Sequence, residues 1–187
     1  MSTYAYIKNL IKDKDIASIT PTSAYGVRKV CRAIDFTKDR VFVEYGPATG
    51  VFTRYILNNM TRGSKMILIE KNANFVSHLR KHFPDNRVFI YHDRAERVRD
   101  IVLRAAEEGA DYVLSGIPFS FLDEATRSDI VRQTHRVLRA GGAFLPYQTF
   151  FQRDSHLLDH MKERFSVVKD GYCFLNVPPM RIYEAIK

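Results

Sequence analysis

Acidic residues follow three apolar stretches of the chain, at positions that suit the binding of a polar ligand. The three stretches are 41–44, 65–70 and 87–91, and each has the composition of a strand that is buried on both faces of a parallel sheet. Glu44 ends the first stretch, Glu70 ends the second, and Asp93 follows the third. Because the carboxyl ends of parallel strands meet at one edge of a sheet, we expect these carboxylates to lie near one another. Ionised carboxylates accept hydrogen bonds, so this edge suits a ligand with hydroxyl or amino groups.

A loop with two glycines joins the first predicted strand to a helix predicted over 51–60. The loop reads Glu44-Tyr45-Gly46-Pro47-Ala48-Thr49-Gly50. Glycine lets the backbone come close to a ligand, and the start of the helix offers unpaired N–H groups. A strand, a glycine loop and a helix open a nucleotide-binding βαβ unit, although the dinucleotide pattern G-x-G-x-x-G is not present here. Loops of this kind also occur without a ligand.

The loop resembles the first motif of S-adenosylmethionine-dependent methyltransferases, E/D-x-G-x-G-x-G, with Ala48 in place of the middle glycine. Glu70 follows Gly50 by about the 20 residues expected for a carboxylate that accepts from both ribose hydroxyls. In this class an Asp after the third strand accepts from the adenine amino group, and Asp93 with Ala95 matches that position. Taken singly, Glu70 could be an exposed acid and Asp93 a helix N-cap. The three acids together favour a cofactor site.

The resemblance therefore implies S-adenosylmethionine as the cofactor and S-adenosylhomocysteine as its product. The predicted cofactor-binding residues are Glu44, Gly46, Pro47, Ala48, Thr49, Gly50, Glu70, Lys71, Asp93, Arg94, Ala95, Ser115 and Gly116. No metal site is predicted, because Cys31 and Cys173 are far apart in the sequence and form no metal-ligand spacing.

Bulk properties narrow the class of protein. The chain of 187 residues favours a single domain with its own core. Its formal net charge of +8 suits a polyanion, either nucleic acid or an anionic membrane surface, although the charge could serve solubility alone. The two separated cysteines favour a reducing, cytoplasmic setting. No apolar run approaches the roughly 18 residues of a spanning helix, and no signal peptide is recognisable.

Predicted strands alternate with predicted helices along most of the chain, which indicates a sheet with helices on both faces. Further strands are predicted over 111–115, 143–150, 165–168, 172–177 and 180–186. Helices are predicted over 22–34, 73–83, 95–108, 122–140 and 154–164, with Gly141-Gly142 ending the helix over 122–140.

We predict an α/β fold of the Rossmann-like class I methyltransferase type. Its sheet is doubly wound, mostly parallel and seven-stranded, with an antiparallel hairpin at the end of the chain. One domain spans residues 1–187, in which 1–39 form an N-terminal helical prefix over the cofactor end and 40–187 form the core.

Residues 1–15 have the pattern of a short amphipathic helix. Tyr4, Ile7, Leu10 and Ile11 share one side, while Lys8 and Lys12 fall elsewhere. Such a helix can lie in a membrane interface with its lysines on anionic head groups, or it can pack on the domain. The pattern alone does not distinguish these alternatives.

The loop after the fourth predicted strand reads Ser115-Gly116-Ile117-Pro118-Phe119. In methyltransferases that act on amino groups of bases, this loop reads N/D-x-P-Y/F, and its Asn or Asp orients the acceptor nitrogen. Gly116 stands at the Asn/Asp position, so that polar group is missing here. We expect Phe119 to be able to stack on an acceptor. The missing acceptor group argues against a nucleic-acid base as the substrate.

Several segments together resemble the bacterial phospholipid N-methyltransferases, which are relatives of the ribosomal RNA adenine dimethylases. They are S-I-T-P-T-S (18–23), V-E-Y-G-P-A-T-G-V-F-T (43–53), S-G-I-P-F (115–119) and G-G-A-F (141–144). The resemblance implies stepwise methyl transfer to the amine of phosphatidylethanolamine, ending at phosphatidylcholine. It also implies peripheral docking through the N-terminal helix, which favours the membrane interpretation of residues 1–15.

Candidate residues for the acceptor follow from the chemistry of a lipid amine. Tyr25 and Tyr147 are candidates to accept from or orient the amine, and their rings could hold a methylated cation; core packing is the alternative for both. Arg153 is a candidate partner for a lipid phosphate, with a solvated surface Arg as the alternative. The predicted substrate residues are Thr20, Pro21, Ser23, Ile117, Pro118, Phe119 and Arg153.

Three functions stay open at this stage. The first is a phospholipid N-methyltransferase, a monomer on the inner face of the cell membrane whose partners are an anionic membrane surface and its lipid substrate. The second is an RNA adenine methyltransferase, which the charge favours and Gly116 disfavours. The third is a membrane-binding relative that has lost methyl transfer.

Overall fold

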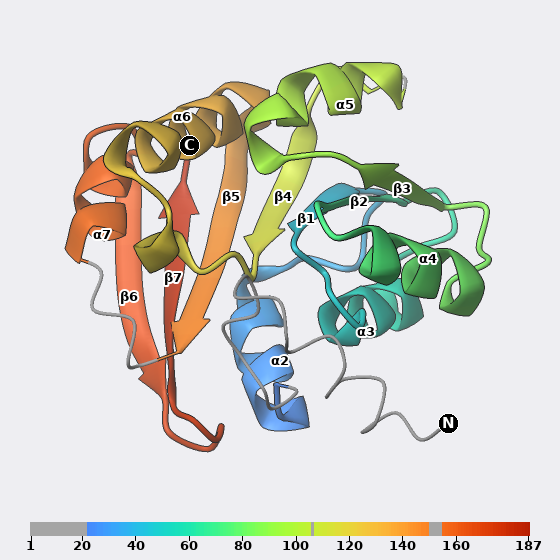
Figure 1. The fold of residues 1–187 in the computed structure, drawn as a ribbon, viewed down its shortest axis with the longest axis horizontal. Coiled ribbons are helices and arrows are strands. Elements are labelled where there is room, and N and C mark those ends of the chain that lie inside the picture. Colours follow the sequence, from blue (N-terminus) through green and yellow to red (C-terminus); the bar gives the residue numbers. More distant parts are fainter. Residues whose placement is uncertain (1–21, 106, 150–154) are drawn as a thin grey trace.

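The computed structural model describes residues 22–105, 107–149 and 155–187. Within them the chain forms a seven-stranded sheet of order β3-β2-β1-β4-β5-β7-β6 (Figure 1). Strands β1 to β5 are parallel, and β7 runs antiparallel to both β5 and β6. The predicted Rossmann-like, mostly parallel sheet with an antiparallel end is confirmed.

The strands are β1 Val41–Tyr45, β2 Lys65–Glu70, β3 Val88–His92, β4 Ala110–Ser115, β5 Leu138–Thr149, β6 Val167–Cys173 and β7 Met180–Ile186. The helices are α2 Ala24–Val30, α3 Val51–Asn59, α4 Ala73–His82, α5 Val98–Arg104, α6 Glu124–Val137 and α7 Ser155–Lys162. Short 3-10 helices are η1 Cys31–Ala33, η2 Ala95–Arg97 and η3 Phe119–Phe121.

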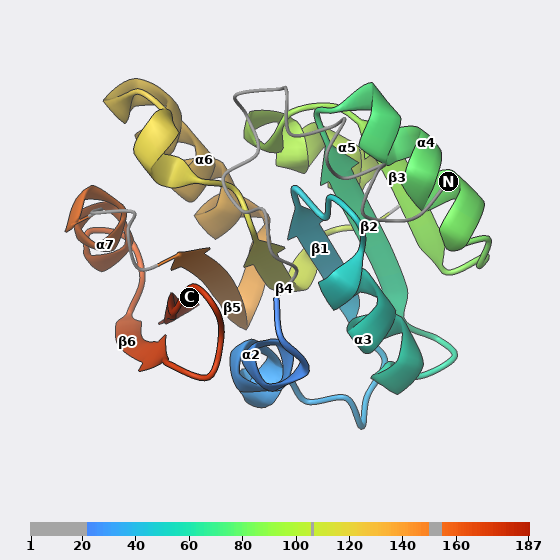
Figure 2. The same cartoon turned by 60° about the horizontal axis from the view of Figure 1, so that its bottom comes forward.

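The central strand β1 is buried along its whole length, and its side chains alternate between two cores. Val41, Val43 and Tyr45 pack in the core that also holds residues of α5, α6 and α7. Phe42 packs in the other core, with residues of α2, α3 and α4. Figure 2 shows α2 and α3 on one side of the sheet and α5 and α6 on the other. A strand covered on both faces explains the apolar stretch that the sequence shows there.

Three element boundaries differ from the prediction. The predicted helix over 122–140 ends at Val137, and β5 begins at Leu138, so Gly141 and Gly142 lie inside a strand. Leu138 adopts extended backbone and pairs with Ala110, with a register shift before Tyr112. The predicted helix over 95–108 is a 3-10 turn followed by the shorter α5. The predicted strands over 165–168 and 172–177 are one strand, β6, and residues 174–177 form the turn after it.

The N-terminal prefix is described from Thr22 onward. Helix α2 buries Gly26, Val27 and Val30, and Ser23 caps it by accepting a hydrogen bond from the Gly26 amide. The predicted amphipathic helix lies outside the described residues, together with Tyr4, Ile7, Lys8, Leu10, Ile11, Lys12, Thr20, Pro21 and Arg153. Within the part of the chain that is described, none of the helices combines the length and apolarity needed to cross a bilayer.

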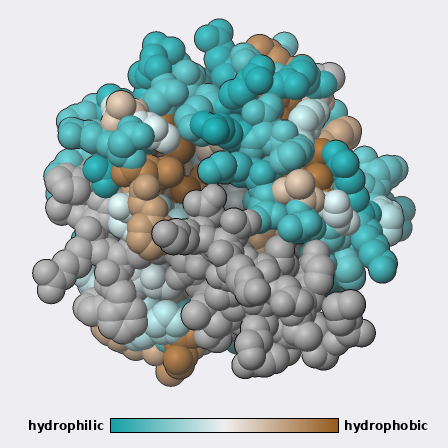
Figure 3. Space-filling model, in the orientation of Figure 1, coloured by the Kyte–Doolittle hydropathy of each residue, from teal (hydrophilic) through white to brown (hydrophobic). Residues whose placement is uncertain are grey.

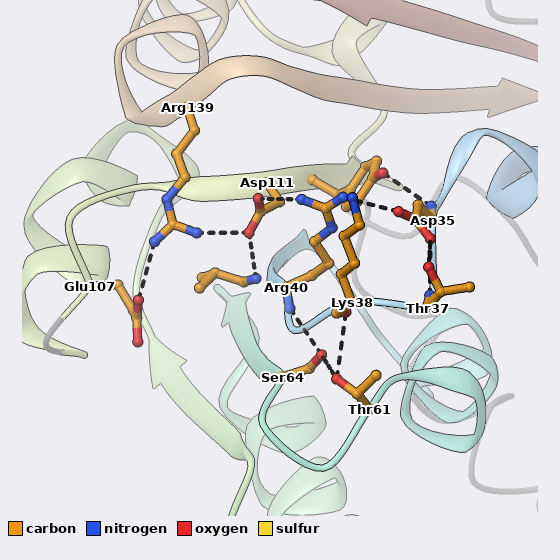
Figure 4. A network of polar contacts seen from close by, with 11 residues as sticks. Asp35, Thr37, Lys38, Arg40, Thr61, Ser64, Glu107, Asp111 and Arg139 are labelled. Carbon is orange, nitrogen blue, oxygen red and sulfur yellow. Dashed lines mark hydrogen bonds and ion pairs between the residues drawn. The ribbon is translucent and has the colours of Figure 1, made fainter.

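A network of charged groups holds the amino ends of the parallel strands (Figure 4). Asp111, at the start of β4, accepts from the Val41 amide at 2.8 Å, from Arg40 at 3.2 Å and from Arg139 at 2.8 Å. Arg40 also pairs with Asp35 at 3.1 Å. The network therefore fixes β1, β4 and β5 to one another at the edge of the sheet opposite their carboxyl ends.

Candidate active site

A cavity of about 740 Å³ lies at the carboxyl edge of the parallel strands. This volume is within the range of roughly 300–1,000 Å³ that small-molecule sites occupy. The predicted site residues that line it are Gly46, Ala48, Glu70, Lys71, Asp93, Arg94, Ala95, Gly116, Ile117, Pro118 and Tyr147. The structure thus brings together positions that are up to about a hundred residues apart in the sequence, as parallel strands ending at one edge require.

The β1–α3 loop has an unusual backbone that shapes one wall of this cavity. Gly46, Ala48 and Gly50 all have positive φ, at 63°, 50° and 79°. Ala48 holds this left-handed conformation although it carries a Cβ atom, and its amide donates to the Glu70 carboxylate at 3.1 Å. At Gly50 a Cβ atom would lie 2.3 Å from the Phe83 ring, so glycine is required there by space as well as by φ.

Glu70 is the buried acid of the cavity wall. One carboxylate oxygen accepts from the Asn72 amide at 2.8 Å, and the other accepts from the Ala48 amide at 3.1 Å. Burial raises the pKa of Glu70, and the backbone donors, beginning with the Asn72 amide, partly offset that rise. Each oxygen can accept a further hydrogen bond, so the carboxylate is oriented and still able to bind ligand hydroxyls.

Asp93 lies across the cavity from the glycine loop, at the end of β3. Its carboxylate is 3.5 Å from Arg104 and 3.9 Å from Arg97, and it accepts from the Arg94 amide at 2.9 Å. The following 3-10 helix η2 has Arg94 at its N-cap and no side-chain cap bond. Asp93 therefore does not serve as the helix cap that was its alternative role.

Glu44 is a predicted cofactor residue that does not line the cavity. It is 1% exposed, and one of its oxygens accepts from the Thr53 hydroxyl of α3 at 2.6 Å. The other oxygen has no hydrogen-bond partner within the described part of the chain. Burial raises the pKa of Glu44 to about 7, although the Thr53 hydrogen bond works against this rise. This carboxyl lies behind the glycine loop, on the side of α3.

Several other predicted residues also lie outside the cavity lining. They are Pro47, Thr49, Gly50, Ser115, Ser23, Tyr25 and Phe119. Ser115 is buried, and its hydroxyl accepts a hydrogen bond from the Ile117 amide at 3.3 Å. It therefore stabilises the loop after β4 without lining the cavity. Tyr25 is 43% exposed on α2, and this placement does not support a contact with the acceptor.

The prediction that Phe119 stacks on the acceptor is wrong. Phe119 is fully buried and packs edge-on against Phe144 in the core beneath α6. Phe121, two residues later, is 67% exposed and lines the cavity. The 3-10 turn η3 explains why Phe121 and not Phe119 faces the cavity, because it directs the two rings to opposite sides of the loop.

Tyr147 fills the space that Gly116 leaves. A Cβ atom on Gly116 would lie 2.6 Å from the Tyr147 hydroxyl oxygen. The Tyr147 ring stacks on Phe52 with centroids 4.2 Å apart. Burial raises the pKa of Tyr147 well above its usual range, and the charge of Glu44 adds to the rise. The phenol therefore stays protonated, and it can orient an amine but not serve as its base.

Gln148 and Asn176 are two of the polar cavity residues that were not predicted to belong to the site. Gln148 is 3% exposed, and neither its amide oxygen nor its amide nitrogen has a partner among the described residues. Asn176, from the β6–β7 turn, accepts from the Ser23 amide at 2.7 Å and donates to the Pro178 carbonyl at 2.7 Å. Gln148 could have been found as a polar residue within an apolar strand, whereas no local pattern indicates Asn176.

Comparison with known proteins agrees with this geometry. A methyltransferase domain model matches residues 43–145, from within β1 into β5. This chain is an S-adenosylmethionine-dependent methyltransferase. It is also 30% identical, over 146 residues, to an ornithine lipid N-methyltransferase of Singulisphaera acidiphila, covering 74% of this chain and 76% of that relative.

Solved structures of low sequence identity share the fold of this methyltransferase. A precorrin-6y C5,15-methyltransferase from Geobacter metallireducens superimposes with a TM-score of 0.71 at 14% identity, covering 94% of this chain and 93% of that one. A TehB-like SAM-dependent methyltransferase from Corynebacterium glutamicum gives a TM-score of 0.67 at 14% identity, covering 98% and 99%. The N-methyltransferase NodS from Bradyrhizobium japonicum gives 0.68 at 11% identity, covering 86% and 93%.

The cavity fits S-adenosylmethionine, the cofactor of this family. The left-handed glycine loop leaves no Cβ atom at Gly46, and the oriented Glu70 carboxylate keeps acceptor capacity for ribose hydroxyls. Asp93 lines the cavity after β3, and its carboxylate can accept a hydrogen bond from a ligand amino group. Among the described residues, no group of His, Cys, Asp or Glu is arranged to hold a metal ion.

Proposed function

We propose that this methyltransferase transfers methyl groups to the amine of phosphatidylethanolamine and its partly methylated forms at a membrane surface, towards phosphatidylcholine. The observation that carries this proposal is the position of the Tyr147 hydroxyl oxygen, which would lie 2.6 Å from a Cβ atom on residue 116. A side chain at position 116, such as the Asn or Asp that would orient the amino group of a base, has no room. The loop is therefore built for a different amine.

The cavity offers neutral polar groups for that amine. The protonated Tyr147 hydroxyl lines it, as does the Gln148 amide, which has no partner among the residues that the structure describes. Their oxygens can accept N–H bonds from an unmethylated or monomethylated amine and so direct its nitrogen lone pair. Phe121, exposed at the cavity, supplies an aromatic face for a partly methylated, cationic amine.

The bound cofactor supplies an electrophilic methyl group on a sulfonium. This chain holds the ribose through Glu70 and orients the acceptor through Tyr147 and Gln148. An alkyl amine is mostly protonated near pH 7, so it must lose a proton before it can attack. Because the pKa of Tyr147 is raised, this phenol does not take that proton. We propose that the proton passes to water before the amine binds beside Tyr147.

The relative from Singulisphaera acidiphila is an ornithine lipid N-methyltransferase, which supports a lipid amine as the acceptor class and makes ornithine lipid the second candidate. The test is methyl transfer from labelled S-adenosylmethionine to three substrates in parallel. They are vesicles of phosphatidylethanolamine with phosphatidylglycerol, vesicles of ornithine lipid with phosphatidylglycerol, and unmethylated ribosomal RNA. Label in phosphatidylethanolamine supports the proposal, label only in ornithine lipid replaces the substrate within the class, and label only on RNA refutes it.

A further inference from the structure

The turn between β6 and β7 exposes a cluster of large apolar side chains. Phe174 is 71% exposed, Leu175 67% and Val177 76%, and Tyr172 at the end of β6 is 37% exposed. Figure 3 shows hydrophobic atoms at the lower edge of the molecule, where Figure 1 places this turn. Single exposed apolar residues are ordinary, but several contiguous ones mark an interaction surface.

Hydrogen bonds hold this turn in place, so the exposure is not that of a loose loop. The Ser23 hydroxyl donates to the Leu175 carbonyl at 3.0 Å. Asn176 points inward, where it is 3% exposed, and it accepts from the Ser23 amide at 2.7 Å. With the backbone fixed and Asn176 turned in, the side chains of Phe174 and Val177 are directed outward.

The neighbouring helix α2 is basic on its outer side. Lys29 donates to the Tyr172 carbonyl at 2.6 Å, which fixes the helix beside the turn. Arg28 and Arg32 are exposed, and their spacing places them on one side of the helical segment. Neither α2 with η1 nor the segment 171–180 contains an acidic residue. An apolar turn beside these positive charges complements an anionic lipid surface.

This surface borders the cavity. Asn176, whose neighbours Leu175 and Val177 point outward, lines the cavity together with Met180 and Thr22. The β6–β7 turn therefore contributes Asn176 to the cavity lining and presents Leu175 and Val177 to the solvent.

We propose that Tyr172, Phe174, Leu175 and Val177, with Arg28, Lys29 and Arg32, form a docking surface for an anionic bilayer. The apolar side chains enter the boundary between head groups and acyl chains, and the basic ones lie on lipid phosphates. Docking of this surface is independent of the acceptor. The further step, in which a lipid head group reaches the cavity past Asn176 without leaving the bilayer, rests on the proposed function.

The test uses the full-length protein and vesicles without any amine-bearing lipid, so that docking is measured apart from methyl transfer. Co-sedimentation compares vesicles of phosphatidylcholine alone with vesicles that contain phosphatidylglycerol. The double variant Phe174→Ser/Leu175→Ser is expected to lower binding to the anionic vesicles by about tenfold or more. Leu103→Ser is the matched control, because Leu103 is 58% exposed on α5, away from this surface.

The charges are tested separately with Arg28→Gln/Arg32→Gln. Each basic residue near an anionic surface changes affinity about fivefold, so this variant should lose roughly 20-fold or more on anionic vesicles and little on neutral ones. Arg99→Gln, on α5, is the control. Thermal unfolding confirms that every variant is folded.

Binding equal to wild type in both double variants would overturn the proposal and assign any membrane contact to other residues. A wild-type dimer that Phe174→Ser/Leu175→Ser converts to monomer would also overturn it, since the surface would then be a contact between copies of this chain. Loss of vesicle binding in a protein that methylates no lipid would support docking and refute only the proposed function.

Discussion

The packing of Tyr147 against Gly116 gives the sharpest prediction, because one substitution tests both the site geometry and the argument about the acceptor. In Gly116→Ala, the new Cβ atom would lie 2.6 Å from the Tyr147 hydroxyl oxygen and 3.1 Å from the ring carbon that carries it. An ordinary contact begins near 3.4 Å, so the two groups must separate by about 0.8 Å.

The Tyr147 side chain cannot move by this distance without an energetic cost. Its ring stacks on Phe52, which is 2% exposed, with centroids 4.2 Å apart. Forcing an extra methyl group into such packing costs about 1–3 kcal/mol. In a protein of this size that corresponds to a loss of about 2–12 °C in Tm. Turnover should fall as well, because Tyr147 is displaced from the acceptor.

Two controls isolate the contact. Gly171→Ala places a methyl group on β6 where nothing lies within 4 Å, so its effect should stay within about 0.5 kcal/mol. Tyr147→Phe removes the hydroxyl and leaves the ring carbon at 3.1 Å. In the double variant Gly116→Ala/Tyr147→Phe, about 1 kcal/mol or more of the loss should be recovered beyond additivity.

Thermal and denaturant unfolding measure these free energies, and isothermal titration with S-adenosylhomocysteine checks that the cofactor site persists. If Gly116→Ala unfolds at the same temperature as Gly171→Ala, then Tyr147 does not occupy the space beside position 116. The explanation for the missing Asn or Asp in the fourth-strand loop would fail with it.

Three further predictions concern the acids. Glu70→Gln should weaken S-adenosylhomocysteine binding about 10- to 100-fold by calorimetry, because the glutamine side chain has one accepting oxygen where the carboxylate has two. Glu108→Gln is the control: Glu108 is exposed and remote from the cavity, so this variant should bind as wild type does. The stabilising contribution of protonated Glu44 is fully present below pH 4.5 and is lost as pH rises through about 7. The free energy of unfolding of Glu44→Gln, measured with denaturant, should therefore rise by roughly 3 kcal/mol relative to that of wild type between pH 4.5 and 8. The same free-energy difference between variant and wild type at both pH values would contradict this. Asp111→Asn should lower the free energy of unfolding by about 1–3 kcal/mol, measured in the same way, and leave cofactor affinity unchanged, because Asp111 lies at the opposite edge of the sheet.

The sequence was sufficient for the sheet and for the ligand edge, because both follow from local patterns. Buried parallel strands appear as apolar runs; Glu70 is the last residue of β2, and Asp93 directly follows β3. The sequence motif places Ala48 in the glycine loop, but it does not predict the backbone conformation of Ala48. Only the structure shows that it turns left-handed and donates to Glu70.

The errors occurred where distant parts of the chain decide the outcome. Gly141 and Gly142 resemble a helix end, but pairing of β5 with β4 and β7 keeps them in a strand. Phe119 and Phe121 are equally apolar in sequence, and only the 3-10 turn between them decides which ring enters the core. Asn176 reaches the cavity through a contact with Ser23, 153 residues earlier in the chain, which no local pattern encodes.

Ser23, the last residue of the T-P-T-S segment and a predicted substrate residue, joins two elements of the fold. The Ser23 hydroxyl caps α2 by accepting from the Gly26 amide, and the same hydroxyl donates to the Leu175 carbonyl. A Cβ atom on Gly26 would lie 2.8 Å from the Met180 Cε atom of β7 and 3.2 Å from the Asn176 amide oxygen of the turn, so glycine favours this close approach of the helix. Ser23 and Gly26 thus join α2 to the β6–β7 turn, and that junction places the basic helix, the apolar turn and Asn176 at one mouth of the cavity. For a lipid acceptor, the placement of these elements matters as much as any direct contact, because the amine arrives attached to a membrane.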